Sequence, residues 1–218
     1  MMIYEHVWGL ETRFVEQPVL LKLLEAKAQL SIQVHPNATC ANLHKVHMKT
    51  EAWCILKPGN IYAGFKPGVT FDDVVRAAGK EDILELLSQR YVRTGEIYLI
   101  PPGVVHSLGA GVSVFEVQQP SDTTYRFFDW HRKRPNGTER ELHIEKALEA
   151  VNVSAPQPEP IERVENEFFT ASRFEAAHLE RVDFTRYVYT PSTGQFKVIM
   201  PGEEFVLSDW SFVATAGI

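Results

Sequence analysis

One short segment, residues 95–106, limits the folds open to this chain more than its composition does. It reads Gly-Glu-Ile-Tyr-Leu-Ile-Pro-Pro-Gly-Val-Val-His, in which an apolar run typical of a strand leads into a Pro-Gly turn. A turn of this kind presents one imidazole, that of His106, as a small β-barrel does when it directs a metal ligand into its mouth. The segment therefore predicts a mainly β fold with a ligand at one end of a barrel.

Three side chains upstream of this segment have the chemistry to complete a metal site. Gln33 and His35 lie two positions apart in a short apolar run, and alternation along a strand directs both to the same face. Glu51 follows in the string Lys-Thr-Glu-Ala-Trp at residues 49–53 and adds a carboxylate. With His106 these residues form a mixed nitrogen and oxygen set from three strands, which suits a borderline divalent ion such as zinc.

A second ligand set stays open at this point. His44, His47 and Glu51 recur at spacings of three and four residues and would share one face of a helix. Their segment lies between strand signals and has the composition of a loop, which favours the set drawn from strands.

Lys49 and Glu116 are candidates for chemistry beside the metal. Lys49 stands two residues before Glu51, so an extended backbone would direct both side chains into one pocket. A solvated loop lysine is the alternative. Glu116 projects from one face of an alternating strand over residues 113–118.

Arg126 lies among aromatic residues in an acidic protein. A guanidinium in this setting indicates a contact with an anion or an oxyanion. The structural alternative is a salt bridge to Asp122 or Asp129.

Composition favours an ordinary globular protein. The 218 residues are 44% hydrophobic and carry a formal net charge of -6, which argues against a nucleic-acid partner. An acidic protein that handles a phosphorylated ligand must collect its cations locally. Cys40 and Cys54 form no CxxC pair and are expected as reduced thiols. With no secretion signal and no apolar run near the roughly 18 residues of a membrane span, we expect a cytoplasmic protein without a membrane partner.

Two domains are expected, a metal-binding catalytic domain over residues 1–155 and a smaller β module over residues 156–218. Prolines at alternate positions in residues 154–160 stiffen the chain and mark the linker between them. The second module reads as short strands. Its single histidine, His178, has no companion at ligand spacing, so no metal is expected there.

Two helical regions are expected in the first domain. Thr70 and Asp73 form a capping-box pattern that opens a small helical insertion over about residues 70–93. Apolar residues at helical spacing predict an amphipathic helix over residues 142–151. Between residues 30 and 56 the pattern predicts two strands with a long loop.

Four segments taken in order resemble type I mannose-6-phosphate isomerases, the zinc-dependent phosphomannose isomerases of the cupin superfamily. The segments are residues 30–36, 49–53, 102–111 and 118–130. The spacing of Gly95, Pro101, Gly103 and His106 also matches the second cupin motif. The resemblance covers about residues 20–155 and rests on specific strings rather than on composition.

The resemblance implies a cupin-type jelly-roll barrel and one zinc ion per chain. It implies interconversion of mannose 6-phosphate and fructose 6-phosphate, a small-molecule sugar phosphate, through an enediol. The implied zinc ligands are Gln33, His35, Glu51 and His106. The positions around the reacting sugar carbons match Lys49, Glu116 and Arg126. Substrate or phosphate positions match Ser31 and Lys22.

Two departures and two rival classes bear on this interpretation. Only about twenty residues precede Lys22, and the region after Pro160 looks compressed. We expect such losses to open the pocket, to shift substrate preference or to require a partner subunit. The rivals are an iron-dependent cupin oxygenase, disfavoured by Gln33 in place of an imidazole, and a non-catalytic sugar-binding cupin. The sequence carries no signal for an oligomeric state.

Overall fold

The computed structural model describes residues 1–176 and 179–217, and the protein is mainly β, as the sequence predicts. His178 lies outside the described residues. None of the described helices has the length and apolar character needed to cross a bilayer.

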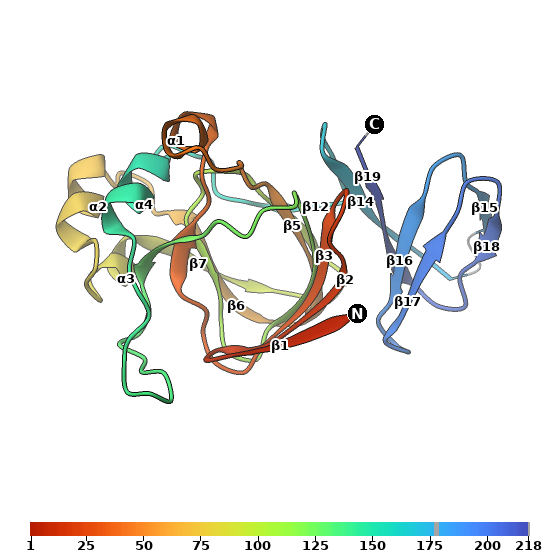
Figure 1. Ribbon diagram of the computed structural model, residues 1–218, viewed down its shortest axis with the longest axis horizontal. Helices are drawn as coiled ribbons and strands as arrows, with labels where there is room; N and C mark the ends of the chain where they lie inside the picture. The colour runs from red at the N-terminus through yellow and green to blue at the C-terminus, as the bar shows by residue number, and fades with distance from the viewer. Residues whose placement is uncertain (177–178, 218) are drawn as a thin grey trace.

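Two antiparallel sheets form the cupin barrel that occupies the centre of Figure 1. In spatial order the larger sheet contains β1 (Met2–His6), β2 (Gly9–Val15), β3 (Leu20–Ala26), β10 (Ser113–Gln118), β5 (Glu51–Lys57), β8 (Ile97–Ile100) and β12 (Pro160–Ile161). The smaller sheet contains β11 (Tyr125–Phe128), β4 (Ile32–Val34), β9 (His106–Leu108), β6 (Gly59–Phe65) and β7 (Leu87–Val92).

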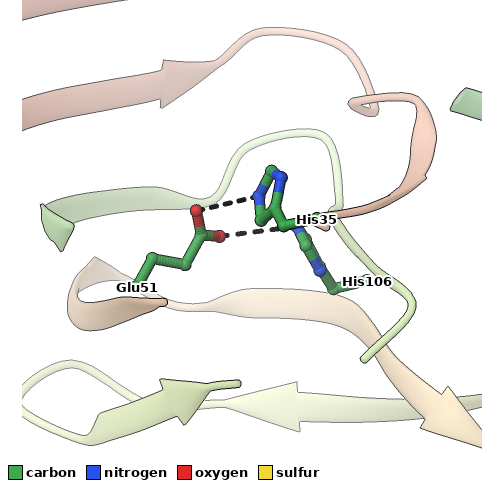
Figure 2. Close-up of side chains that lie close together, drawn as sticks. All are labelled: His35, Glu51 and His106. Carbon is green, nitrogen blue, oxygen red and sulfur yellow. Dashed lines mark ion pairs between the residues drawn. The ribbon is translucent and has the colours of Figure 1, made fainter. Parts of the chain in front are cut away.

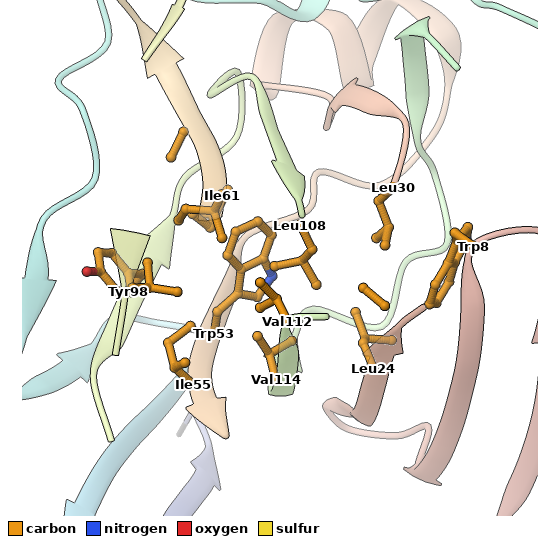
Figure 3. Close-up of a cluster of buried hydrophobic side chains, with 14 of the residues drawn as sticks. Trp8, Leu24, Leu30, Trp53, Ile55, Ile61, Tyr98, Leu108, Val112 and Val114 are labelled. Atoms are coloured by element: carbon orange, nitrogen blue, oxygen red, sulfur yellow. The ribbon is translucent and has the colours of Figure 1, made fainter. Parts of the chain in front are cut away.

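The central strands of the larger sheet are buried on both faces. On β5, Trp53 and Ile55 belong to the apolar cluster inside the barrel, which Figure 3 draws, together with Val114 of β10. The alternate residues Cys54 and Phe115 belong to a second cluster on the other face of the sheet. Burial on both faces explains why the middle of β5, Ala-Trp-Cys-Ile-Leu, is a continuous apolar run.

Short helices lie together on one side of the barrel (Figure 1). They are α1 (Ala38–His44), α2 (Phe71–Ala77), α3 (Ile83–Leu86) and α4 (Ile144–Ala150). The predicted capping box of α2 is present: the Thr70 hydroxyl accepts from the backbone N–H of Asp73, and the Asp73 carboxylate accepts from that of Thr70. The predicted helix over residues 142–151 corresponds to α4.

Two segments differ from the prediction. Residues 87–92 form β7 rather than continuing the helical insertion, because they pair with β6 along their length and bury Leu87 and Val92 at the two ends. Within the predicted loop after β4, α1 forms because the Asn37 side chain accepts from the backbone N–H of Cys40 and caps the helix.

The C-terminal strands form a separate sheet that packs on the outer face of the larger barrel sheet (Figure 1). Its spatial order is β13 (Arg163–Glu165), β14 (Phe169–Phe174), β19 (Ser211–Ala216), β16 (Arg186–Thr190) and β17 (Gln195–Ile199), and a two-stranded sheet joins β15 (Leu179–Arg181) to β18 (Glu204–Val206). One apolar layer contains residues of both units, and the rings of Phe115 and Tyr189 stack across it with centroids 5.0 Å apart. The boundary near residue 155 falls between α4 and β12 and stays a prediction.

Candidate metal centre and the adjoining cavity

Three buried ligand groups meet inside the barrel. His35 directly follows β4, Glu51 begins β5 and His106 begins β9 after a turn in which Gly103 has a φ of 83°. Their side chains are at most 1% exposed, and one ligand atom from each lies within 4.8 Å of the others. Figure 2 shows the Glu51 carboxylate facing both imidazole rings.

Backbone carbonyls determine the tautomer of both rings. His35 Nδ1 lies 3.0 Å from the carbonyl oxygen of Thr123, and His106 Nδ1 lies 2.9 Å from that of Val104. A carbonyl can only accept, so each Nδ1 carries the proton and each Nε2 presents a bare lone pair. Both Nε2 atoms therefore have the form that a metal requires.

Both lone pairs face the Glu51 carboxylate, and that of His106 also faces the amide nitrogen of Gln33. The Nε2 atoms of His35 and His106 lie 3.0 Å and 3.4 Å from the two Glu51 oxygens. Among the described residues, His35 Nε2 and Glu51 Oε1 are buried without a hydrogen-bond partner, while Lys49 Nζ lies 2.9 Å from Glu51 Oε2. Electron-rich atoms that face one another in a dry site are stabilised by a cation between them, so the donor set fits a metal ion.

The charges around the centre hold it in a metal-ready protonation state. Burial, and then the positive charge of Lys49, lower the pKa of His35 to about 3, and burial also lowers the pKa of His106. Burial alone would raise the pKa of Glu51, but Lys49 and His35 outweigh it and hold that pKa well below its usual value. At neutral pH the centre offers two neutral imidazoles and one carboxylate.

Gln33 lies opposite His106 in the pairing of β4 with β9. Its Nε2 is 3.3 Å from His106 Nε2, while its Oε1 accepts from the Ser31 hydroxyl at 3.0 Å. Half a turn of the amide would present the oxygen to the centre and let the nitrogen donate to Ser31, so the hydroxyl satisfies either orientation. Ser31 is buried behind Gln33 and is not a lining residue of the adjoining cavity.

A cavity of about 320 Å³ adjoins the centre, and its lining contains more cationic than anionic side chains. Its charged lining comprises the cations Arg13, Lys22, Lys49, Arg126 and Arg140 and the carboxylates Glu11, Glu116 and Asp122. In a chain with a net charge of -6, this local excess of cations favours an anionic ligand. A larger cavity of about 440 Å³ lies on the C-terminal sheet and contains none of the predicted site residues.

Glu116 is buried in the cavity wall and is held from two sides. The Trp53 indole N–H donates to one carboxylate oxygen at 3.0 Å, and Lys22 Nζ lies 3.6 Å from the other. Burial and the negative charge of Glu51 raise the pKa of Glu116 to about 7. A carboxyl group that titrates near neutrality can both accept and return a proton.

Lys49 is buried, which rules out the solvated-loop alternative. Its Nζ lies 2.9 Å from the Glu51 carboxylate. Burial would lower the pKa of Lys49, but Glu51 and Glu116 outweigh it and raise that pKa. Lys49 therefore keeps its charge beside the centre.

Arg126 lies opposite Gln33 in the pairing of β11 with β4. Neither alternative salt bridge forms, because Asp122 pairs with Arg13 and Asp129 pairs with Arg132 and Arg140. Within the described part of the chain, Arg126 Nε is buried without a hydrogen-bond partner. The guanidinium is therefore available to an anion in the cavity.

The alternative ligand set on a helical face is wrong. Helix α1 ends at His44, and Lys45 then takes a left-handed conformation with a φ of 53°. His47 is therefore not on the helix, and Glu51 belongs to β5.

Several cavity residues were not predicted from the sequence. They are Trp53, Arg13, Glu11, Thr124 and Arg140. Trp53 stands opposite Glu116 in the pairing of β5 with β10, and that register is not readable from either strand alone. Arg13 and Glu11 come from β2, whose place beside β3 brings them to Lys22.

Comparison with known proteins was made in sequence and in structure. No protein-family model matches the chain. The chain is 37% identical over 169 residues to the mannose-6-phosphate isomerase ManA of Bacillus subtilis. The aligned region covers 74% of this chain and 53% of the relative. It is 35% identical over 144 residues to the mannose-6-phosphate isomerase of Streptococcus mutans, covering 64% of this chain and 45% of the relative. The chain thus spans about half the length of these relatives.

Solved structures agree with this similarity. The crystal structure of the mannose 6-phosphate isomerase from Bacillus subtilis matches 92% of this chain and 75% of its own with a TM-score of 0.67 and 25% identity. A mannose 6-phosphate isomerase bound with zinc and yttrium matches 92% of this chain and 80% of its own with a TM-score of 0.58 and 15% identity, a likeness of fold alone.

Proposed function

We propose that this chain, a relative of the type I mannose-6-phosphate isomerases in sequence and in fold, is a metal-dependent aldose–ketose isomerase that interconverts mannose 6-phosphate and fructose 6-phosphate. The observation that carries the proposal is the buried set of bare ligand atoms beside a cavity with excess positive charge. Such a site combines a place for a cation with a place for a sugar phosphate.

Zinc is the proposed ion, with Gln33, His35, Glu51 and His106 as the residues that would hold it. When bound, a divalent cation polarises a carbonyl and a neighbouring hydroxyl and so stabilises negative charge on their oxygens. Lys49 stabilises the buried Glu51 carboxylate among these residues, because its positive charge offsets the negative charge of Glu51.

Glu116 is proposed to move the proton between the two carbons. In the direction from aldose to ketose, the carboxylate removes the proton from C2, the released electron pair forms the C1–C2 double bond, and the C1 carbonyl oxygen takes up a proton to give the enediol. The Glu116 carboxyl, whose proton exchanges with solvent, then protonates C1 while the C2 hydroxyl loses its proton and the C2 carbonyl forms. Trp53 and Lys22 orient the carboxylate for both transfers.

Arg126 is proposed to face the oxygen on which charge develops. Its Nε has no hydrogen-bond partner among the described residues, so the guanidinium is available to an anion. A fixed cation in a water-poor site contributes several kcal/mol to the stability of such an intermediate. Lys22 is the proposed phosphate contact within the cationic lining.

The test supplies mannose 6-phosphate to the purified chain in D₂O. We expect fructose 6-phosphate in a coupled assay, deuterium at the exchanged carbon by NMR, and loss of both signals with a chelator. Glu51→Gln and His106→Ala should lose bound metal and activity, whereas Glu81→Gln, at an exposed position outside the cavity, should retain both.

Other outcomes separate the rival classes. Sugar phosphate binding without exchange in the metal-loaded protein would contradict an isomerase and support a non-catalytic cupin. Oxygen consumption with bound iron would support an oxygenase.

A further inference from the structure

A second group of metal-ligating side chains lies outside the barrel. Cys40 and His44 belong to α1 and Glu149 belongs to α4, two helices that lie side by side in Figure 1. One ligand atom from each residue lies within 4.8 Å of the others. None of the three is part of the proposed active site.

The two helices present these groups to one another. Cys40 and His44 are four residues apart on α1 and therefore share a face. The Cys40 thiol is buried and lies 3.9 Å from the Lys146 carbonyl of α4, and His44 Nε2 forms an ion pair with Glu149 Oε2. The Asn37 side chain also donates to the Ala150 carbonyl at 2.9 Å, which holds the start of α1 against the end of α4.

A buried tyrosine hydroxyl lies beside the cluster. Tyr125 is 4% exposed, and the neighbour of its hydroxyl is the Cys40 thiol, a weak hydrogen-bonding group. The Tyr125 ring centroid lies 6.4 Å from that of His44. A water molecule bound to a cation would be a stronger partner for this hydroxyl than a thiol is.

We propose that Cys40, His44 and Glu149 bind a second divalent cation of the zinc type, which joins α1 to α4. The ligand chemistry supports this choice, since sulfur, imidazole and carboxylate together suit zinc better than magnesium or calcium. Thiolate and carboxylate would neutralise the dication, and three protein ligands leave one tetrahedral position for the water beside Tyr125.

Binding has a defined proton balance. Burial and the charge of Glu149 raise the pKa of the Cys40 thiol, so the metal-free cluster holds a protonated thiol. The Cys40 sulfur forms its bond to the cation as its proton leaves to solvent. The second cysteine, Cys54, belongs to the buried apolar layer of β5 and has no comparable neighbours in the described residues.

Cobalt(II) provides a direct test, because a thiolate ligand gives cobalt an intense charge-transfer absorption in the near ultraviolet. The barrel centre has no sulfur ligand, so this band reports on the second site alone. We expect the full chain to develop the band on titration with Co²⁺. Cys40→Ser should abolish the band and lower the bound metal by one equivalent.

Matched variants make the result specific. Cys54→Ser should keep the band, and Glu149→Gln should weaken cobalt binding at least tenfold while Glu145→Gln, an exposed neighbour on the same helix, leaves it unchanged. Glu51→Gln should lose the metal of the barrel and keep the band, so failure of the proposed active site and failure of this second site are distinguishable. Absence of the band at saturating cobalt, or a band that survives Cys40→Ser, would overturn the proposal.

Discussion

Lys22 lies between three carboxylates and influences the protonation of the residue proposed to move the proton. Its Nζ is 3.6 Å from Glu116 and 3.8 Å from both Glu11 and Asp122. The pKa of Glu116, raised to about 7 by burial and by Glu51, would be higher still without the nearby lysines.

Replacing Lys22 should therefore move the pH profile in a defined direction. Lys22→Met removes a positive charge beside Glu116, which favours the protonated carboxyl and raises its pKa. We expect the acid limb of kcat against pH to move to higher pH by about one unit. Lys22→Arg keeps the charge and should leave the limb in place. A Lys22→Met variant with an unmoved limb would show that another group controls it.

Glu11 makes the stability of the fold depend on pH. Burial raises the pKa of this carboxyl, but a hydrogen bond from His6 and the charges of Lys22 and Arg13 outweigh it and lower the pKa to about 2 from 4.5. A depressed folded-state pKa stabilises the protein above the unfolded value, and this contribution disappears as the pH falls from 4.5 toward 2.

Urea unfolding of the wild type and of Glu11→Gln checks this expectation. The variant should be less stable by on the order of 3 kcal/mol at neutral pH, and the difference should shrink as the pH falls toward 2. A difference that does not change with pH would contradict the assigned pKa.

Among the site residues, those with a local signature were predictable from the sequence. His106 follows a Pro-Gly turn, and Gln33 and His35 share a strand face, so neighbouring residues indicate their direction. Trp53 and Arg13 have no such signature. Their roles depend on which strand lies beside which, and on the register of that pairing.

The capping box of α2 is a local device whose contribution can be measured alone. Thr70→Ala removes the side chain that accepts from the Asp73 backbone N–H, and we expect a loss of about 1 kcal/mol in the free energy of unfolding. Thr70→Ser keeps the hydroxyl and should lose only a few tenths of that. Equal losses in the two variants would indicate that packing of the methyl group, rather than the cap, stabilises the helix start.

Elements with a buried face were predictable, and elements without one were not. The alternating run at residues 113–118 and the helical spacing before residue 151 correspond to β10 and α4. All five residues of β1 are exposed, including the apolar Met2 and Ile3, so this strand has no buried face and owes its form to pairing with β2. The segment at residues 87–92 reads Leu-Ser-Gln-Arg-Tyr-Val and buries only its two end residues, so its strand form depends on pairing with β6 and is not readable from the segment alone.

The apolar layer between the barrel and the C-terminal sheet joins the two units into one folding system. Phe115 and Tyr189 stack within it, and Phe14 packs beside Phe196. We therefore expect the two units to unfold together, since separating them exposes the apolar faces of both sheets.

Hydrogen exchange followed by mass spectrometry tests this coupling. Tyr189→Ala should destabilise the fold by about 3–5 kcal/mol and accelerate exchange by the same factor in β16 and in β10. Tyr91→Ala, at an exposed position on β7, is the control and should change neither. Acceleration confined to β16 would indicate that the C-terminal sheet opens independently.

The two peptide oxygens that hold the imidazoles of the barrel, those of Thr123 and Val104, have a consequence for how such a protein can diverge. A peptide oxygen persists through every amino-acid exchange, so no point mutation can delete either acceptor. Only a change in the course of the main chain can displace them. Selection for a working centre should therefore remove insertions and deletions near residues 104 and 123. Single amino-acid replacements at and around these two positions should be tolerated more often.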